Sequence, residues 1–189
     1  MPFQVNAESM FSHMGDFAEE LTEKRAFHTG CEPTPRNEID EIINWINFYS
    51  NNRNVYLDAN FDPYDVDYHP RDLLKDAFAI IWEESWFINE PDQDNGTGFG
   101  WAAMQWNTAK DLQSRVYDWE EISQNKLYKH REQAKYMVGY LLWLKNHYGD
   151  RHRTILGYNK GPGVRRVNGQ TYFNRFVKKR RILDSRLDP

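Results

Sequence analysis

The residues with the clearest capacity for chemistry are two adjacent carboxylates, Glu83 and Glu84, which end an apolar segment. At about 100° of rotation per residue, Glu84 falls on the apolar stripe formed by Leu73, Ala77, Ile80 and Ile81. Glu83 points about 100° away, on a face shared with Asp72 and Asp76 that we expect to meet water. Apolar surroundings disfavour a charged carboxylate and raise its pKa, which suits a general acid near neutral pH. Glu84 is therefore the candidate acid, and an ordinary ion-paired carboxylate at a helix end is the alternative.

Polar residues after this segment could complete a site. The turn at 95–100 contains Asn-Gly and further glycines, a strong turn signal that also lets backbone approach a ligand closely. Gln105 could hydrogen-bond a polar group such as the acetamido group of a sugar, or be a plain helix residue. Asp92 and Asp94 are candidates for a second carboxylate, although loop aspartates near turns usually bond backbone.

A metal site is not expected. Asp58, Asn60 and Asp62 have the spacing that opens a calcium-binding loop. However, Pro63 stands where that loop needs glycine, and His69 stands where it needs glutamate. The segment therefore favours an ordinary acidic loop, and we expect neither a metal nor another cofactor.

The scaffold for these groups is predicted to be almost wholly helical. Apolar spacing indicates helices over 6–28, 38–49, 71–86, 108–125, 131–148, 153–158 and 171–180. Asn37 is the expected N-cap of the second helix, Pro70 suits the first turn of the third, and Gly149 is a stop signal. The fold class is mainly α, with at most a small β element near 89–101.

The chain of 189 residues is long enough for one domain with a sizeable core. Its single cysteine, Cys31, excludes an internal disulfide. No apolar run approaches the roughly 18 residues of a membrane span, and the N-terminal residues lack the layout of a signal peptide.

Charge is unevenly distributed within the net charge of −4. Residues 1–150 carry 13 basic and 26 acidic side chains, whereas residues 151–189 carry 11 and 2. The basic end culminates in Lys178, Lys179, Arg180 and Arg181. This cluster could attract an anionic wall polymer or another polyanion, or be a solvated helix end.

The order of these motifs resembles the catalytic domain of the soluble lytic transglycosylases, in the lysozyme-like superfamily. The matching motifs are Glu84-Ser85-x-Phe87, Met104-Gln105 after a glycine turn, Tyr140-Leu141, Tyr148-Gly149, Tyr158-Asn159-x-Gly161-Pro162-Gly163 and Tyr172. The resemblance covers about 72–179. It implies a catalytic domain over 71–189 with a helical N-terminal extension, 1–70, packed on it.

The resemblance implies cleavage of the β-1,4 bond between N-acetylmuramic acid and N-acetylglucosamine in peptidoglycan, with Glu84 as the single catalytic carboxylate and a 1,6-anhydro product. Ser85 and Gln105 would place substrate, Tyr158 would hydrogen-bond Glu84, and Asn159 would line the cleft. Tyr172 completes the implied substrate-binding set.

The chain departs from the family pattern at several positions near this site. Ala102 and Ala103 replace the usual Gly-Leu, and Lys160 replaces a small residue. Gln133 and Met137 stand where the family favours Asn and Gly. These differences bear on the shape of the cleft more than on the class of reaction.

Two other functions remain open from the sequence. One is a peptidoglycan hydrolase of the muramidase or goose-type lysozyme kind, in which Asp92 or Asp94 positions water. The other is a non-enzymatic module that binds glycan or a polyanion. For the leading hypothesis we expect a monomer that acts on the cell wall without binding nucleic acid, either as a bacteriophage lysin or virion-associated enzyme or as a periplasmic or extracellular bacterial enzyme.

Overall fold

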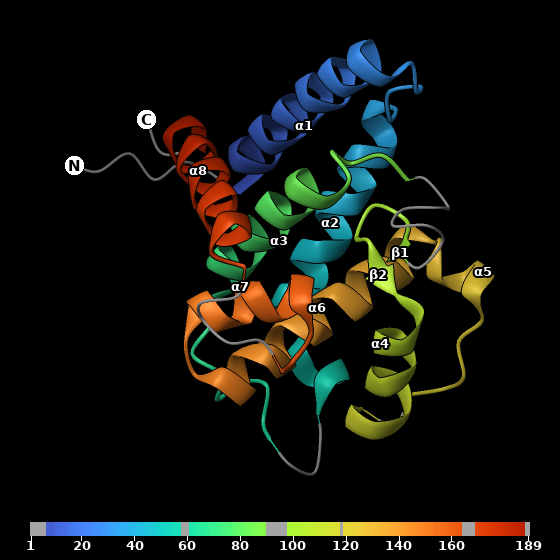
Figure 1. Cartoon of the computed structure of the whole chain (residues 1–189), viewed down its shortest axis with the longest axis vertical. Coiled ribbons are helices and arrows are strands. Elements are labelled where there is room, and N and C mark those ends of the chain that lie inside the picture. Colours follow the sequence, from blue (N-terminus) through green and yellow to red (C-terminus); the bar gives the residue numbers. More distant parts are fainter. Residues whose placement is uncertain (1–6, 58–60, 90–97, 118, 164–168, 188–189) are drawn as a thin grey trace.

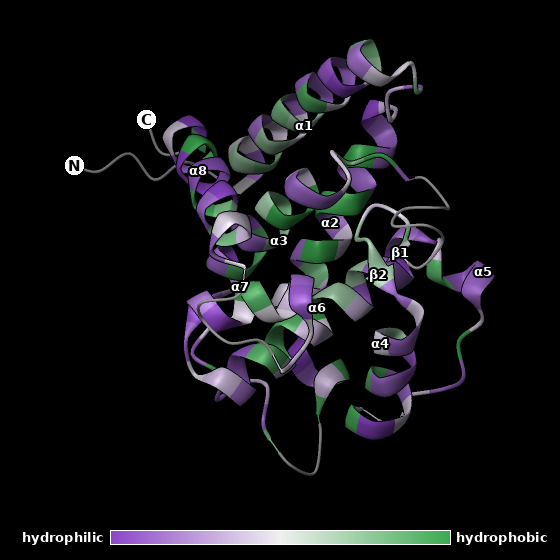
Figure 2. Cartoon of the chain, viewed as in Figure 1, coloured by the Kyte–Doolittle hydropathy of each residue, from purple (hydrophilic) through white to green (hydrophobic). Residues whose placement is uncertain are grey.

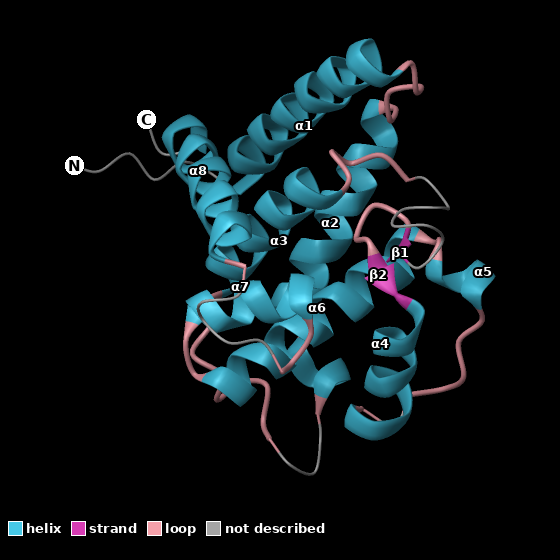
Figure 3. Cartoon of the chain, viewed as in Figure 1, coloured by secondary structure: helices cyan, strands magenta, loops and turns pink. Residues whose placement is uncertain are grey.

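A computed structural model of the chain describes residues 7–57, 61–89, 98–117, 119–163 and 169–187. It is mainly helical, as the apolar spacing predicts (Figures 1 and 3). The α-helices are α1 (Ala7–Thr29), α2 (Arg36–Asn51), α3 (Pro70–Glu84), α4 (Trp106–Asp111), α5 (Gln124–Leu127), α6 (His130–Tyr148), α7 (Arg151–Lys160) and α8 (Gln170–Leu187). A 3₁₀ helix, η1 (Arg53–Tyr56), a π-helix, η2 (Leu112–Val116), and strands β1 (Gly98–Phe99) and β2 (Met104–Gln105) complete the described elements.

Helix α3 is the central element, and it begins where the sequence predicts. Pro70 occupies the first turn, and the His69 side chain accepts a hydrogen bond of 3.2 Å from the Arg71 backbone N–H. The ten residues from Leu73 to Trp82 are all buried. A helix that is buried on every side must be covered by several neighbours, and α3 packs against α2, α6 and α8.

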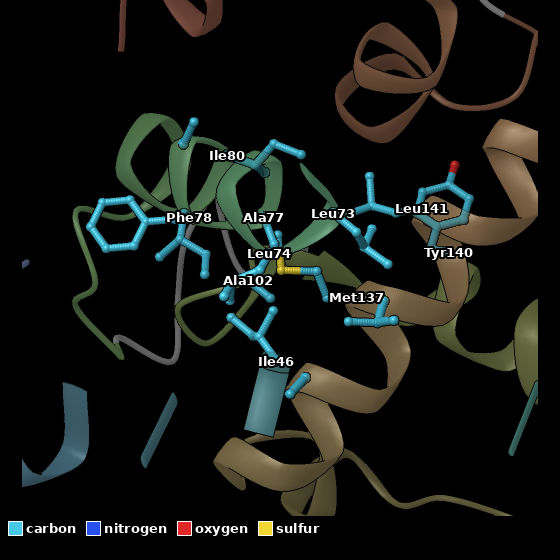
Figure 4. Packing of buried hydrophobic residues seen from close by; sticks show 14 of the residues in the cluster. Ile46, Leu73, Leu74, Ala77, Phe78, Ile80, Ala102, Met137, Tyr140 and Leu141 are labelled. Atoms are coloured by element: carbon cyan, nitrogen blue, oxygen red, sulfur yellow. The ribbon is translucent and has the colours of Figure 1, made fainter. Parts of the chain in front are cut away.

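The core joins the first helices to the later ones. The predicted stripe of α2 is buried as Ile39, Ile42, Ile43, Ile46 and Tyr49. Figure 4 shows Ile46 of α2 meeting side chains of α3 and α6 around Ala102. Figure 2 shows the hydropathy that underlies this arrangement, with apolar residues gathered on α2 and α3 and a largely hydrophilic α8. Residues of α1 and α2 thus share one buried cluster with the segment after residue 70.

The N-terminus of α2 corrects one prediction. The helix begins at Arg36, and its N-cap is Pro35, with φ −59° and ψ 146°. The Pro35 carbonyl accepts the backbone N–H of Ile39 at 3.1 Å. Asn37 therefore lies inside the first turn and does not cap the helix.

The acidic face of α3 corrects a second prediction, because α8 covers it. The Asp76 side chain is 0% exposed and pairs with Arg151 and Arg180. The Glu83 side chain is 8% exposed and pairs with Lys179. The expectation that this face meets water holds for Asp72, whose side chain is 58% exposed, and was wrong for Asp76 and Glu83. The phase of one helix does not reveal which distant segment packs on it.

The β element extends further along the chain than predicted. Strands β1 and β2 are antiparallel, with Gly98 opposite Gln105 and Phe99 opposite Met104. The chain reverses between them through left-handed residues, Gly100 at φ 63° and Ala103 at φ 47°. The Ala103 N–H donates to the Gly100 carbonyl at 3.1 Å. A small β element is confirmed, but its second strand lies beyond the predicted 89–101.

The segment predicted as a helix over 108–125 is helical only in part. Helix α4 runs into η2, which closes with the Tyr117 N–H bonded to the Leu112 carbonyl at 2.9 Å. The Tyr117 hydroxyl then donates to the Gly139 carbonyl at 2.7 Å, and the Trp119 indole to the Val55 carbonyl at 2.9 Å. These contacts hold the chain in an irregular path before α5.

The last three helices follow the prediction with longer bounds. Helix α6 ends at Gly149, whose left-handed φ of 70° fits its expected role as a stop. Helix α7 spans Arg151–Lys160, and α8 extends beyond residue 180 to Leu187. Within the described ranges, every helix falls short of the length or the apolar character that a bilayer crossing needs.

Candidate functional site

A cavity of about 220 Å³ opens beside the C-terminal end of α3. Segments from α3, the β turn, α4, α6 and α7 meet around it. Its lining residues are Glu84, Ala103, Met104, Gln105, Thr108, Tyr140, Tyr158, Asn159, Lys160 and Gly161.

Glu84 is the last residue of α3 and is partly buried. As the helical phase predicts, Glu84 lines this cavity, and Glu83 is not among its lining residues. The Asn159 side-chain amide donates to Glu84 Oε1 at 3.2 Å. Helix α7 holds Asn159 in place, and Asp150 caps that helix by accepting the Arg153 N–H at 2.8 Å.

Backbone strain is concentrated around this site. Among the described residues, the non-glycine positions with positive φ are Trp86 (57°), Phe87 (65°) and Ala103 (47°). Two of them directly follow the helix end that carries Glu84, and the third lines the cavity. Left-handed conformations cost bulky residues energy and cluster at functional sites, so this distribution supports a site here.

Ser85 has a different role from the one implied by the resemblance. It is buried, and its hydroxyl lies 2.7 Å from the Trp101 carbonyl oxygen and 3.2 Å from that of Ile81. The hydroxyl oxygen also accepts the Phe87 N–H at 3.2 Å. Ser85 therefore ties the end of α3 to the β turn and does not present its hydroxyl to a substrate.

Tyr158 also differs from its expected role. Its hydroxyl donates to the Ala102 carbonyl at 2.8 Å, so its proton is not directed to Glu84. The buried Gln133 side chain accepts the Ala102 N–H at 3.1 Å. Both polar groups of Ala102 are thus bonded by side chains, which fixes the turn that faces Glu84. Burial, followed by the charge of Glu84, raises the pKa of the Tyr158 phenol well above its usual value.

Tyr172 of α8 is brought to the same place as Glu84. Burial raises the pKa of its phenol well above the usual value, and the neighbouring Glu84 carboxylate raises it further. The buried hydroxyl interacts with Glu84 by hydrogen bonding as well as by charge. Tyr172 is therefore a neutral phenol beside the candidate acid.

Gln105 lies at the exposed end of β2 and lines the cavity, as a substrate-contacting residue must. The candidate second carboxylates, Asp92 and Asp94, lie outside the described residues. Asp58 and Asn60 of the acidic loop lie outside them as well. Among the residues that are described, no group of three or more His, Cys, Asp or Glu side chains could hold a metal ion.

The sequence assigned no role to Thr108, whereas Tyr140 appeared there only in a matched motif and Lys160 only as a departure from the family pattern. All three line the cavity. Tyr140 shares the apolar stripe of α6, so its type and spacing do not separate it from core tyrosines. Lys160 directly follows Asn159, and this adjacency was the sequence signal that could have placed Lys160 in the site. Thr108 enters the site because α4 starts at the end of β2.

Comparison with known proteins identifies no relative. No family model, curated protein or solved structure matches this chain. The resemblance to lytic transglycosylases therefore rests on the sequence motifs alone.

The basic cluster on α8 is not the exposed patch that its sequence indicates. Arg180 is buried against Asp72, Asp76 and Asp184. The Lys179 side chain is 15% exposed. Only Lys178 and Arg181 of the four are exposed. Lys179 and Arg180 are therefore withdrawn as candidate polyanion contacts, since they bind α3, and a polyanion contact through Lys178 and Arg181 stays a prediction.

Proposed function

We propose that this protein is a lytic transglycosylase with a lysozyme-like helical domain that cleaves the β-1,4 bond between N-acetylmuramic acid and N-acetylglucosamine in peptidoglycan. One observation carries the proposal. Glu84 is the sole carboxylate among the described residues that line the cavity, and it lies among the motifs of the resemblance.

The chemistry needs one carboxyl group that first gives and then takes a proton. Protonated Glu84 donates to the glycosidic oxygen as the C1–O bond breaks, and the substrate's acetamido group supports the positive charge at C1. The Glu84 carboxylate then accepts the proton of the C6 hydroxyl, whose oxygen bonds to C1. The product is a 1,6-anhydro sugar, and Glu84 is protonated again.

The surrounding residues suit these steps. The Asn159 amide orients Glu84 through the 3.2 Å hydrogen bond, and Gln105 at the exposed rim is placed to bond a sugar amide. Ser85 and Tyr158 hold the β turn, which lines the same cavity through Ala103. Hydrolytic glycosidases usually need two carboxyl groups about 5–9.5 Å apart, and the described lining supplies one.

Mass spectrometry of digested peptidoglycan tests the proposal. Wild type should release muropeptides with 1,6-anhydro ends, each lighter by one water than the hydrolytic product. Glu84→Gln should lower the rate by at least about a hundredfold, the usual scale for loss of a general acid–base group. Glu23→Gln, on the exposed side of α1, is the matched control and should keep the wild-type rate.

The other outcomes separate the alternatives. Ordinary reducing ends would replace the transglycosylase with a muramidase, in which Asp92 or Asp94 positions water. Full wall-lysing activity in Glu84→Gln would refute the site. Glycan binding without any cleavage by wild type would favour the non-enzymatic module.

A further inference from the structure

The two glutamates at the end of α3 are adjacent in sequence but lie in different surroundings. Glu84 lines the cavity. The Glu83 side chain is 8% exposed, and its carboxylate is paired with both Arg175 and Lys179 of α8. An ion-paired carboxylate thus immediately precedes, in the sequence, the one that would carry the proton.

Lys179 is held firmly at this position. Its ammonium lies 2.7 Å from Glu83 Oε2 and donates to the Trp82 carbonyl at 3.0 Å. It also lies 5.2 Å from the ring centroid of Trp82 and 5.1 Å from that of Trp86, within the range of cation–π attraction. This geometry keeps a positive charge at the end of α3 with little room to move away.

The charge of Lys179 acts on both glutamates. Burial lowers the pKa of its ammonium, whereas the hydrogen bond and charge of Glu83, and then the charge of Glu84, raise it. The attraction is mutual, so Lys179 favours ionised Glu84 while the negative charge of Glu83 opposes ionisation. Partial burial strengthens both effects relative to water.

We propose that Glu83 and Lys179, here called the charge pair, are positioning residues that set how readily Glu84 holds its proton. Glu83 keeps negative charge beside Glu84 and engages the ammonium that would otherwise favour the ionised acid. This inference rests on the proposed role of Glu84 as general acid, and it assigns a function to the α8 side of the site.

Other groups around Glu84 do not replace the charge pair. The phenols stay neutral because burial raises their pKa values, and the one lysine of the cavity lining is exposed, where water screens its charge. Arg175 pairs with Glu83 and belongs to the same ion-paired group. These titratable or charged groups of the described chain are Tyr140, Tyr158, Lys160, Tyr172 and Arg175.

Substitution of the two partners separates a charge effect from a structural one. Glu83→Gln and Lys179→Met break the same ion pair, so any purely structural loss should act in the same direction. Loss of the negative charge should lower the pKa of Glu84, and loss of the positive charge should raise it. A general acid must be protonated, so activity is lost as pH rises through that pKa.

The experiment is a pH–rate profile on peptidoglycan for wild type, both single variants and the double variant. The alkaline limb should move to lower pH in Glu83→Gln and to higher pH in Lys179→Met, each by about half a unit or more. The double variant should lie near wild type. Shifts in the same direction, or no shift in either variant, would overturn the inference.

Asp184→Asn is the matched control. Asp184 also anchors α8 to α3, through Lys75 at 2.9 Å, and it pairs with Arg180 at 3.1 Å. Lys75 lies nine residues before Glu84, about 13 Å along the helix axis. The alkaline limb should stay in place in this variant, and a shift equal to that of Glu83→Gln would overturn the inference.

Carbon-13 NMR titration of the glutamate carboxyl groups distinguishes this inference from the proposed function. The Glu84 signal is assigned by its loss in Glu84→Gln and followed in the same variants. Opposite pKa shifts without any glycan cleavage would support the charge pair and refute the enzyme. Glycan cleavage with an unchanged Glu84 pKa in the variants would support the enzyme and refute the role of the charge pair. If Glu83→Gln does not fold, the direction of the Lys179→Met shift decides.

Discussion

The carboxylates on the two sides of α3 differ in their burial and in their partners. On the side that faces α8, Asp76 and Glu83 have side chains that are 0% and 8% exposed, and both are paired with cations. On the side that faces the cavity, Glu84 is partly exposed and accepts a hydrogen bond from the neutral amide of Asn159.

This difference separates groups that hold the fold from groups available for chemistry. A carboxylate enclosed by cationic side chains is held by its ion pairs and has no open path to a ligand. A carboxylate on a cavity wall can change its protonation state and meet a substrate. We therefore expect substitutions on the α8 side to lower stability, with an added shift in the pH dependence of activity for the charge pair, and those on the cavity side to lower activity.

The largest effect on stability is expected for Asp76→Asn. This change removes the carboxylate that Arg151 and Arg180 share, and it replaces by an NH2 donor one of the two oxygens that accept from these groups and from the Tyr68 hydroxyl at 2.7 Å. Breaking a buried pair from one side costs about 3–5 kcal/mol, measured as a lower free energy of unfolding in urea. Asp72→Asn, at a side chain 58% exposed, should cost less than about 1 kcal/mol. Equal losses of stability in Asp76→Asn and Asp72→Asn would show that burial does not decide how much each ion-paired carboxylate contributes.

A smaller effect, on activity, is expected for Asn159→Ala. A hydrogen bond to a charged group contributes about 1.5–3 kcal/mol, so the rate of peptidoglycan cleavage should fall about ten- to hundredfold. The urea midpoint should change little, because Asn159 is only partly buried at the end of α7. Asn174→Ala, an exposed asparagine on α8, is the matched control. A large loss of stability with unchanged activity would place Asn159 in the scaffold.

The smallest effect is expected for Ala103→Gly. Glycine relieves the left-handed φ of 47°, and the relief of about 1–2 kcal/mol is partly offset by backbone entropy of about 0.5–1 kcal/mol. Stability should rise by up to about 1.5 kcal/mol while activity falls, because a turn that lines the cavity with Glu84 is loosened. Ala102→Gly, at an ordinary φ, should instead lose stability. Gains at both positions would show that strain is not concentrated at the cavity.

Local signals predicted much of the fold. The isoleucine stripe of α2, the start of α3 at Pro70 and the stop at Gly149 all occur as expected. Each depends on residues within a few positions of one another, so spacing and backbone preference were sufficient. The prediction that Asn37 caps α2 failed because Pro35, two residues earlier, occupies the N-cap position.

The candidate site was predicted only in part. Glu84, Gln105, Tyr158 and Asn159 meet at one cavity, in keeping with the motifs that named them. The direction of the hydroxyl groups was not predictable. Tyr158 bonds a carbonyl that lies 56 residues earlier in the chain, and Ser85 bonds one that lies 16 residues later. Side-chain type does not specify which carbonyl the folded chain will supply.

The sequence by itself determined the helical content and the phase that separates Glu84 from Glu83, because both follow from periodicity within one segment. Only the tertiary structure decided what each carboxylate meets. Helix α8 begins at Gln170, 86 residues after Glu84, and its cations convert an apparently solvated face into a buried ion-pair network. Charges separated by such lengths of chain interact only after packing brings them together, so no local pattern encodes their pairing.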